Sequence, residues 1–271
     1  MRVKTPEAKR KKSPKKSSRL FQAKLKLPND PNSGLTTCIE CQMTYSSNSS
    51  KDILEHNRYH DLHTNGKKWF HGWGTILMNF ENNNAFITPP STSSSDCENG
   101  TTRRIYNEYI AAISPEKPIE VKHMIELMNA VNRDLSAPAD NEFWSEAGSK
   151  NQGRAFIYVK NGRAVGAITI EYIKETDSKG RWMRLSNRNL VPKVVAKVKL
   201  GISRIWVCKS QRRNGLATRL LECARTHSII GNQVARWEMA WSQPSESGSL
   251  LARKYNSVKH KSGELLVPCY I

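Results

Sequence analysis

Apolar and polar residues alternate with a period that changes several times between residue 105 and the last residue of the chain. Apolar side chains recur at every third or fourth position across residues 121–135, which predicts an amphipathic helix. Two apolar runs, at 155–159 and 164–173, flank Asn161-Gly162, a dipeptide that favours a tight hairpin turn. The pattern also predicts strands at 105–113, 202–208, 237–242 and 265–271, and helices at 216–227 and 249–255. Strands that alternate with helices predict an α/β fold.

The N-terminal part of the chain lacks this alternation. Residues 1–33 are rich in Lys, Ser and Pro and hold too little apolar surface to fold, which predicts a disordered basic tail. Its lysine runs are typical of a nuclear-import signal or a nucleic-acid-binding arm, and a solvated tail explains them equally well. Asn, Ser, Thr and Pro dominate the segment that we predict to be a linker. The predicted domains are the tail (1–33), a compact unit (34–75), the linker (76–104) and a folded domain (105–271).

Charge and cysteine content narrow the class of protein. The 271 residues include 43 Lys and Arg against 24 Asp and Glu, which gives a formal net charge of +19 at pH 7. This excess predicts an acidic partner, such as nucleic acid, a chromatin surface or a phosphorylated cofactor. No apolar run is long enough to span a bilayer, and no secretory segment follows Met1. We therefore expect no membrane association and a reducing compartment without disulfides.

Four residues have the spacing of a metal site. The pattern Cys38-x2-Cys41 followed by His56-x3-His60 is that of a C2H2-type zinc finger, in which a knuckle supplies two thiolates and one helix face supplies two imidazoles. Two free thiols and two surface histidines are the alternative. The segment 42–55 is longer than the usual loop of about twelve residues, and a single finger reads only about three base pairs. We therefore expect a structural or docking finger, and DNA contact stays open.

The segment that joins the strand at 202–208 to the helix at 216–227 has a phosphate-binding pattern, Arg212-x-x-Gly215-x-Ala217. Gly215 and Ala217 let the backbone approach a pyrophosphate closely. The first amides of a helix have no intrahelical partner and carry partial positive charge, so they bind anions. Arg212 and Arg213 add positive charge. The segment therefore predicts a phosphorylated cofactor.

This loop also has the form of the acyl-CoA loop of the GCN5-related N-acetyltransferase fold. Together with residues 201–207, residues 240–244 and the upstream finger, the chain resembles the cohesin acetyltransferase family that establishes sister-chromatid cohesion. Residues 180–183 and 266–271 resemble the yeast members. The resemblance implies a mixed central sheet, acetyl-CoA as donor, and lysines on the ATPase head of an SMC-family cohesin subunit as acceptors. It also implies action in the nucleus during S phase.

The resemblance assigns the cofactor contacts. The backbone of Ile205, Trp206 and Val207 would pair with the pantetheine arm. The pyrophosphate would be held by Arg213, Asn214, Gly215, Leu216, Ala217 and Thr218, and the CoA site would be completed by Ser245, Glu246 and Ser247.

The resemblance also points to Ser203, Glu222 and Gln243 as catalytic residues. Position 243 departs from the pattern expected in animal relatives, which is Asp, and an amide cannot act as a base. Helical spacing places Glu222 on the face opposite Leu216 and Leu220, where a solvated carboxylate is an equal alternative. The identity of the general base therefore stays open.

Two hypotheses of different classes remain at this point. The first is a lysine acetyltransferase that acts on cohesin, and the second is a nucleic-acid-binding or chromatin-binding finger protein with a non-catalytic scaffold. Only the first explains the loop at 212–217. Within the tail, Gln22 and Leu25 resemble a reduced binding element for the replication sliding clamp, which is the weakest of the predicted partners.

Overall fold

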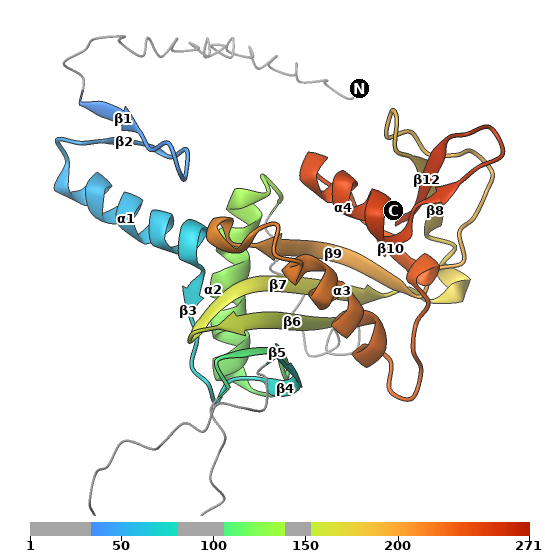
Figure 1. The fold of residues 1–271 in the computed structure, drawn as a ribbon, viewed down its shortest axis with the longest axis horizontal. Helices are drawn as coiled ribbons and strands as arrows, with labels where there is room; N and C mark the ends of the chain where they lie inside the picture. Colours follow the sequence, from blue (N-terminus) through green and yellow to red (C-terminus); the bar gives the residue numbers. More distant parts are fainter. Residues whose placement is uncertain (1–33, 81–105, 139–152) are drawn as a thin grey trace, which may run out of the picture.

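The computed structural model describes residues 34–80, 106–138 and 153–271, and its main feature is a large mixed β-sheet (Figure 1). The predicted tail, including Gln22 and Leu25, and most of the predicted linker lie outside the described residues. The strands of this sheet are β3 (Lys67–Lys68), β4 (Thr75–Asn79), β5 (Glu108–Ala112), β6 (Gly153–Lys160), β7 (Arg163–Tyr172), β8 (Gly180–Arg184), β9 (Leu200–Val207), β10 (Met239–Trp241), β11 (Val258–Lys259) and β12 (Leu265–Tyr270).

The strand order along the sheet is β11-β12-β10-β9-β7-β6-β5-β4, with β3 paired to β7 and β8 paired to β12. Strands β9, β10 and β12 run parallel to one another, and the other pairs are antiparallel. The mixed sheet that the resemblance implies is therefore confirmed. Two short strands, β3 and β4, join this sheet although they lie N-terminal of the predicted boundary at residue 105, so the sheet draws on residues from both sides of it.

The longest hairpin forms where the sequence predicts it. Asn161 and Gly162 connect β6 to β7 with φ angles of 51° and 69°, and a tight hairpin turn needs positive φ at both central positions. Asn tolerates this conformation better than most residues, and Gly adopts it without steric cost. The two central strands are therefore aligned by local chemistry.

Strand β10 is shorter than the predicted strand at 237–242. Residues Arg236–Glu238 form a 3-10 turn instead, because the Glu238 carboxylate accepts a hydrogen bond from the Ala235 N–H at 2.9 Å and pairs with Lys199 at 2.7 Å. Pairing between β9 and β10 covers only Met239↔Leu200 to Trp241↔Ile202. Beyond this point β9 continues without β10 beside it, so the sheet is split there.

Two helices pack on opposite faces of the sheet. Helix α2 (Pro118–Asp134) reaches Trp206 of β9, whereas α3 (Leu216–His227) packs over Gly166 of β7, where a Cβ would lie 3.1 Å from Leu220. Gly166 is aligned with the neighbour of Trp206, and adjacent strand residues point to opposite faces. Helix α4 (Glu246–Asn256) follows β10. No described helix is long and apolar enough to cross a membrane.

The N-terminal unit is a small finger attached to one end of α2 (Figure 1). Strands β1 (Leu35–Thr37) and β2 (Thr44–Ser46) form a separate two-stranded sheet, followed by α1 (Ser50–Asn65). The Ser49 hydroxyl caps α1 by accepting the Asp52 N–H at 3.3 Å, and Gly66 ends it with φ of 79°. This folds the finger and leads the chain directly into β3.

The segment 174–200, between β7 and β9, contributes a strand. Within it, β8 pairs antiparallel with β12 from Gly180↔Tyr270 to Arg184↔Leu266. Gly180 is required there, because a Cβ would lie 2.0 Å from the Ala196 carbonyl oxygen. The terminal strand is thus held by β8, β10 and β11 together.

Candidate functional site

The four predicted metal ligands come together in the finger. The ligand atoms of Cys38, Cys41, His56 and His60 all lie within 4.8 Å of one another. The Cys38 Sγ lies 3.4 Å from His60 Nδ1. The turn between the cysteines closes with hydrogen bonds from Cys38 N to Met43 O and from Gln42 N to Cys38 O. Two sulfur and two imidazole donors in one cluster match the preference of tetrahedral zinc.

Burial and electrostatics of these residues also fit a metal ion. The His56 Nε2 atom is buried and has no hydrogen-bond partner in the described part of the chain, while the ring stacks on Tyr45 at 4.0 Å. A buried polar atom without a partner is costly, and coordination of a cation removes that cost. Hydrogen bonds from the Cys41 backbone and from His56 lower the pKa of the Cys38 thiol to about 6, which favours the thiolate that zinc binds. Burial raises the pKa of Cys41.

The second candidate site begins at the split between β9 and β10. The Cys208 N–H donates to Val165 O at 2.8 Å, so the alternate residues Ile205 and Val207 direct their backbone groups away from β7. The Val207 carbonyl accepts instead from Arg212 Nε at 2.9 Å. Of the three predicted pantetheine contacts, Ile205 and Val207 thus present backbone groups to the split, whereas the backbone of Trp206 faces β7.

The loop after β9, where the pyrophosphate contacts are predicted, has a backbone geometry that suits an anion. Arg213 and Gly215 have φ of 68° and 80°, and Gly215 is the N-cap of α3 without any side-chain cap. The first amides of the helix, from Leu216 to Thr218, have no intrahelical acceptor and carry the positive end of the helix dipole. Asn214 lies between the two left-handed residues, in the turn that aims these amides. The structure therefore brings the predicted pyrophosphate contacts into one turn.

The last predicted cofactor contacts lie at the N-terminus of α4. The Ser245 hydroxyl caps this helix by accepting the Gly248 N–H at 3.2 Å, and it lies 3.3 Å from the Ser247 hydroxyl. Ser245, Glu246 and Ser247 are all exposed. Because α3 follows β9 and α4 follows β10, the N-termini of both helices lie at the ends of the two strands that separate.

Two of the predicted catalytic residues lie at the start of the split. Ser203 is the first residue of β9 beyond the last pair with β10, it is 6% exposed, and its carbonyl accepts from the Ser242 hydroxyl at 3.0 Å. Gln243 follows Ser242 in the exposed turn that leads to α4. Ser203 and Gln243 are therefore brought to the same edge, one buried and one facing solvent.

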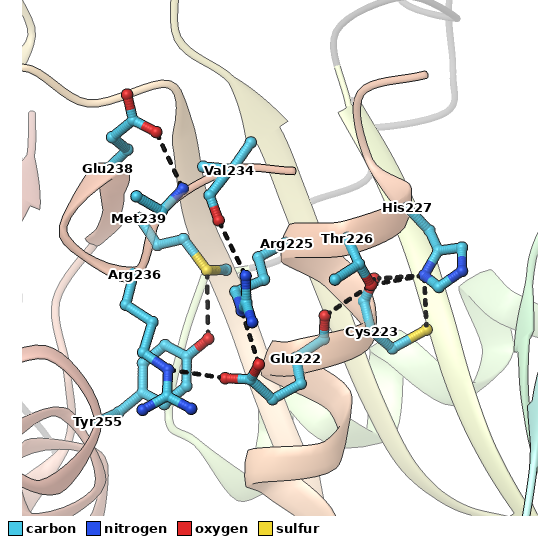
Figure 2. A network of polar contacts seen from close by, with 11 residues as sticks. Glu222, Cys223, Arg225, Thr226, His227, Val234, Arg236, Glu238, Met239 and Tyr255 are labelled. Atoms are coloured by element: carbon cyan, nitrogen blue, oxygen red, sulfur yellow. Dashed lines mark hydrogen bonds and ion pairs between the residues drawn. The ribbon is translucent and has the colours of Figure 1, made fainter. Parts of the chain in front are cut away.

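The third, Glu222, lies on α3, with its carboxylate directed toward Arg225 and Arg236 (Figure 2). Its carboxylate accepts from Arg225 Nε at 2.6 Å and from Arg236 Nε at 2.9 Å, and the Arg236 guanidinium lies 5.1 Å above the Tyr255 ring. Burial alone would raise the pKa of Glu222, but hydrogen bonds from Arg225 and Tyr255 and the nearby arginine charges hold it below its ordinary value. A carboxylate with both oxygens occupied and a lowered pKa is a weak base.

Sequence reasoning missed three residues at this site. The Asp134 side chain, at the end of α2, accepts from Trp206 Nε1 at 2.8 Å. The Tyr270 hydroxyl donates to Glu171 at 3.1 Å, and the Tyr270 ring packs on Gly201, where a Cβ would lie 2.7 Å from it. No sequence motif predicts these contacts, since each joins residues far apart in the chain.

Comparison with known proteins identifies the family to which this arrangement of finger, sheet and helices belongs. Family models described as “zinc-finger of acetyl-transferase ESCO”, “Acetyltransferase (GNAT) family” and “ESCO1/2 acetyl-transferase” match residues 22–62, 121–229 and 196–267. The chain is 56% identical to “N-acetyltransferase ECO1” of Eremothecium gossypii, covering 97% of this chain and 98% of that protein. The chain belongs to the ECO1/ESCO family of N-acetyltransferases.

Further relatives of this ECO1/ESCO protein span a wide range of identity. “N-acetyltransferase ECO1” of Saccharomyces cerevisiae is 40% identical over 93% of this chain and 95% of its own length. “Structure of xEco2 acetyltransferase domain” aligns with a TM-score of 0.47 at 25% identity, covering 62% of this chain and 94% of that chain. The family predicted from the sequence is confirmed.

The same findings settle the class of reaction. The ECO1/ESCO chain is an acetyltransferase that uses acetyl-CoA, with zinc as the metal of its finger. The hypothesis of a non-catalytic scaffold is therefore wrong. The individual catalytic and cofactor contacts stay predictions.

Proposed function

We propose that this chain transfers the acetyl group of acetyl-CoA to lysine side chains on the ATPase head of an SMC-family subunit of cohesin, and that this establishes sister-chromatid cohesion in S phase. The observation that carries the transferase part is the open edge of β9 between the N-termini of α3 and α4. Membership of the ECO1/ESCO family supports the proposed acceptor. The site of action is the nucleus, on chromatin.

The donor site is assigned residue by residue. Ile205 and Val207 pair with the pantetheine amides through backbone groups that face the split. The amides of Gly215 to Thr218, together with Arg213, hold the pyrophosphate. Ser245 and Ser247 supply hydroxyls from the other side. When bound, acetyl-CoA would supply a thioester whose carbonyl carbon would bond to the lysine nitrogen as the C–S bond breaks, and the CoA thiolate would leave with the proton that the nitrogen then loses.

A neutral lysine amine is needed for this transfer, and its formation from the ammonium at neutral pH costs about 4–5 kcal/mol. We assign Glu171 as the acceptor of that proton, acting through Tyr270. Burial and the Glu171 charge raise the pKa of Tyr270, so its hydroxyl keeps a proton that it donates to Glu171. The hydroxyl can therefore pass one proton to Glu171 while it accepts another from the lysine.

Ser203 and Gln243 have supporting roles in this assignment. Ser203 opposes the rise in the Tyr270 pKa through a hydrogen bond, which links it to the same proton path. Gln243, an uncharged side chain in the exposed turn, orients the acceptor. Glu222 links α3 to the 3-10 turn before β10 rather than accepting a proton, because its two oxygens are held by Arg225 and Arg236.

The acceptor is tested by offering two basic substrates to the full chain. Equal concentrations of purified cohesin SMC heads and of histones are incubated with acetyl-CoA, and acetyl-lysine is quantified by mass spectrometry. We expect acetylation of the heads to exceed that of histones, and Gly215→Asp, which puts a carboxylate into the pyrophosphate cradle, to abolish both. Preferred acetylation of histones would contradict the proposed acceptor.

Binding to the replication sliding clamp through Gln22 and Leu25 is tested separately. Failure of Gln22→Ala to weaken binding to the purified clamp would contradict this partnership.

A further inference from the structure

The Asp134 carboxylate is the point where the finger, α2 and the donor strand meet. Its side chain is 2% exposed. From α1 of the finger, the Tyr59 hydroxyl donates to it at 2.9 Å and His63 Nδ1 lies 2.7 Å from both of its oxygens. From β9, Trp206 Nε1 donates at 2.8 Å, and the Arg212 guanidinium lies at 4.0 Å. One buried carboxylate thus joins the finger helix to the donor site.

The partners of Asp134 on the finger helix differ in role from its partners on β9 and in the loop that follows. Trp206 lies between Ile205 and Val207, so the indole contact fixes the segment of β9 whose backbone faces the split. Arg212 donates a hydrogen bond to the Val207 carbonyl, and it is the first residue of the predicted pyrophosphate-binding loop. A buried carboxylate needs several donors, since each missing donor leaves a costly unpaired acceptor. The finger therefore supplies two of the groups that hold this carboxylate beside Trp206 and Arg212.

Zinc fixes those finger donors. Tyr59 precedes the ligand His60, and His63 lies one helical turn after it, on the same α1 helix. A small finger holds its helix in place mainly through the metal, because it has little core of its own. A second contact supports the link, since Lys209 of the loop after β9 donates to the Glu40 carbonyl, between the two cysteines.

We propose that Asp134 is a positioning residue that couples zinc occupancy of the finger to acetyl-CoA binding. With zinc bound, Tyr59 and His63 hold the carboxylate, and the carboxylate holds Trp206 and the loop. With zinc removed, these donors leave, and β9 and the loop lose their orientation. The inference rests on the proposed donor site, and it adds a regulatory role for the finger.

Titration of the full chain with acetyl-CoA by calorimetry, with zinc bound and after a strong chelator, tests the coupling. We expect chelation to weaken binding by about five- to twentyfold, and by linkage acetyl-CoA strengthens zinc binding by the same factor. A zinc-responsive dye measures the second value without any acetyl transfer. In steady-state assays, Asp134→Asn raises the KM for acetyl-CoA and leaves kcat at saturating donor unchanged.

Three variants separate coupling from general stability. Tyr59→Phe removes a single hydroxyl and is expected to bring the ratio of acetyl-CoA affinities with and without zinc closer to one. In Asp134→Asn we expect this ratio to equal one. Asp61→Asn is the matched control, because Asp61 lies on the same helix but pairs at 2.6 Å with Arg163, on the β6–β7 hairpin. It is expected to keep the wild-type ratio.

The outcomes are distinguishable. Acetyl-CoA binding that does not depend on zinc in the wild type would overturn the coupling alone, as would an unchanged ratio in Asp134→Asn or an equal loss in Asp61→Asn. Tyr59→Phe keeps the test valid if Asp134→Asn does not fold. Absence of acetyl-CoA binding in the zinc-loaded wild type would overturn the proposed donor site, and the coupling with it.

Discussion

Gly215→Ala isolates the contribution of the anion cradle to donor binding. Gly215 has φ of 80°, and in the described part of the chain no heavy atom beyond its own surrounding backbone and chain neighbours lies within 4 Å of a Cβ built on it. The folded state therefore resists the methyl group only through backbone strain, which costs about 1 kcal/mol for a left-handed alanine. Gly162 in the β6–β7 turn has φ of 69° and equally open surroundings, so Gly162→Ala is a control with matched strain.

The two variants are expected to differ in donor affinity. Strain at Gly215 turns the first amides of α3 away from the pyrophosphate, and a hydrogen bond to a charged group is worth about 1.5–3 kcal/mol. The loss of one such bond weakens acetyl-CoA binding roughly ten- to hundredfold. Both variants lower the melting temperature by about 2–4 °C. Calorimetric titration measures the affinity, and equal affinity for acetyl-CoA in both variants would refute the cradle.

Three further predictions follow from the site. Glu171→Gln and Tyr270→Phe lower kcat about 10²- to 10⁴-fold with an unchanged KM for acetyl-CoA, and wild-type kcat in either would contradict the proton path. Glu222→Gln keeps kcat. Because the folded-state pKa of Glu222 is lowered, the stabilisation by this carboxylate is present above about pH 4.3 and is lost as the pH falls further. The free energy of unfolding, measured with urea, therefore changes less between pH 7 and pH 3 in this variant than in the wild type. Cys38→Ala lowers the zinc content to zero by metal analysis, and one retained zinc would show a different ligand set.

Elements with a strong local pattern are those that the sequence predicts well. Helix α3 spans the predicted 216–227, because Gly215 fixes its start and the leucines repeat with helical period. The hairpin at Asn161-Gly162 and the zinc ligands follow from short-range spacing in the same way. Strand β10 is different, since Glu238 captures the Ala235 amide and takes the preceding residues into a turn. The competition depends on Lys199, which only the tertiary fold brings close.

The residues of the candidate site also fall into two groups, those with a local sequence pattern and those without one. The loop at 212–217 has a recognisable spacing because consecutive amides make the cradle. Asp134, Glu171 and Tyr270 act through partners that are distant in the chain, as between Asp134 and Trp206 or between Tyr270 and Glu171. An isolated Asp at a helix end or a Tyr in a terminal strand has no distinguishing neighbour in the sequence. Such residues become visible only when the sheet and the helices place them together.

The split in the sheet explains why these distant contacts are needed. A central strand is normally held by hydrogen bonds to a strand on each edge, but the pairing of β9 with β10 ends at Ile202, and in our proposal a ligand pairs with β9 beyond this point. Its orientation then depends on side chains: Trp206 on Asp134, and Arg204 on Asn132 at 3.1 Å. Glu222 does the equivalent between α3 and the 3-10 turn that precedes β10, through its ion pair with Arg236. A strand that serves as a binding edge therefore requires anchors from outside the sheet, and in this chain one of those anchors is itself held by the zinc finger.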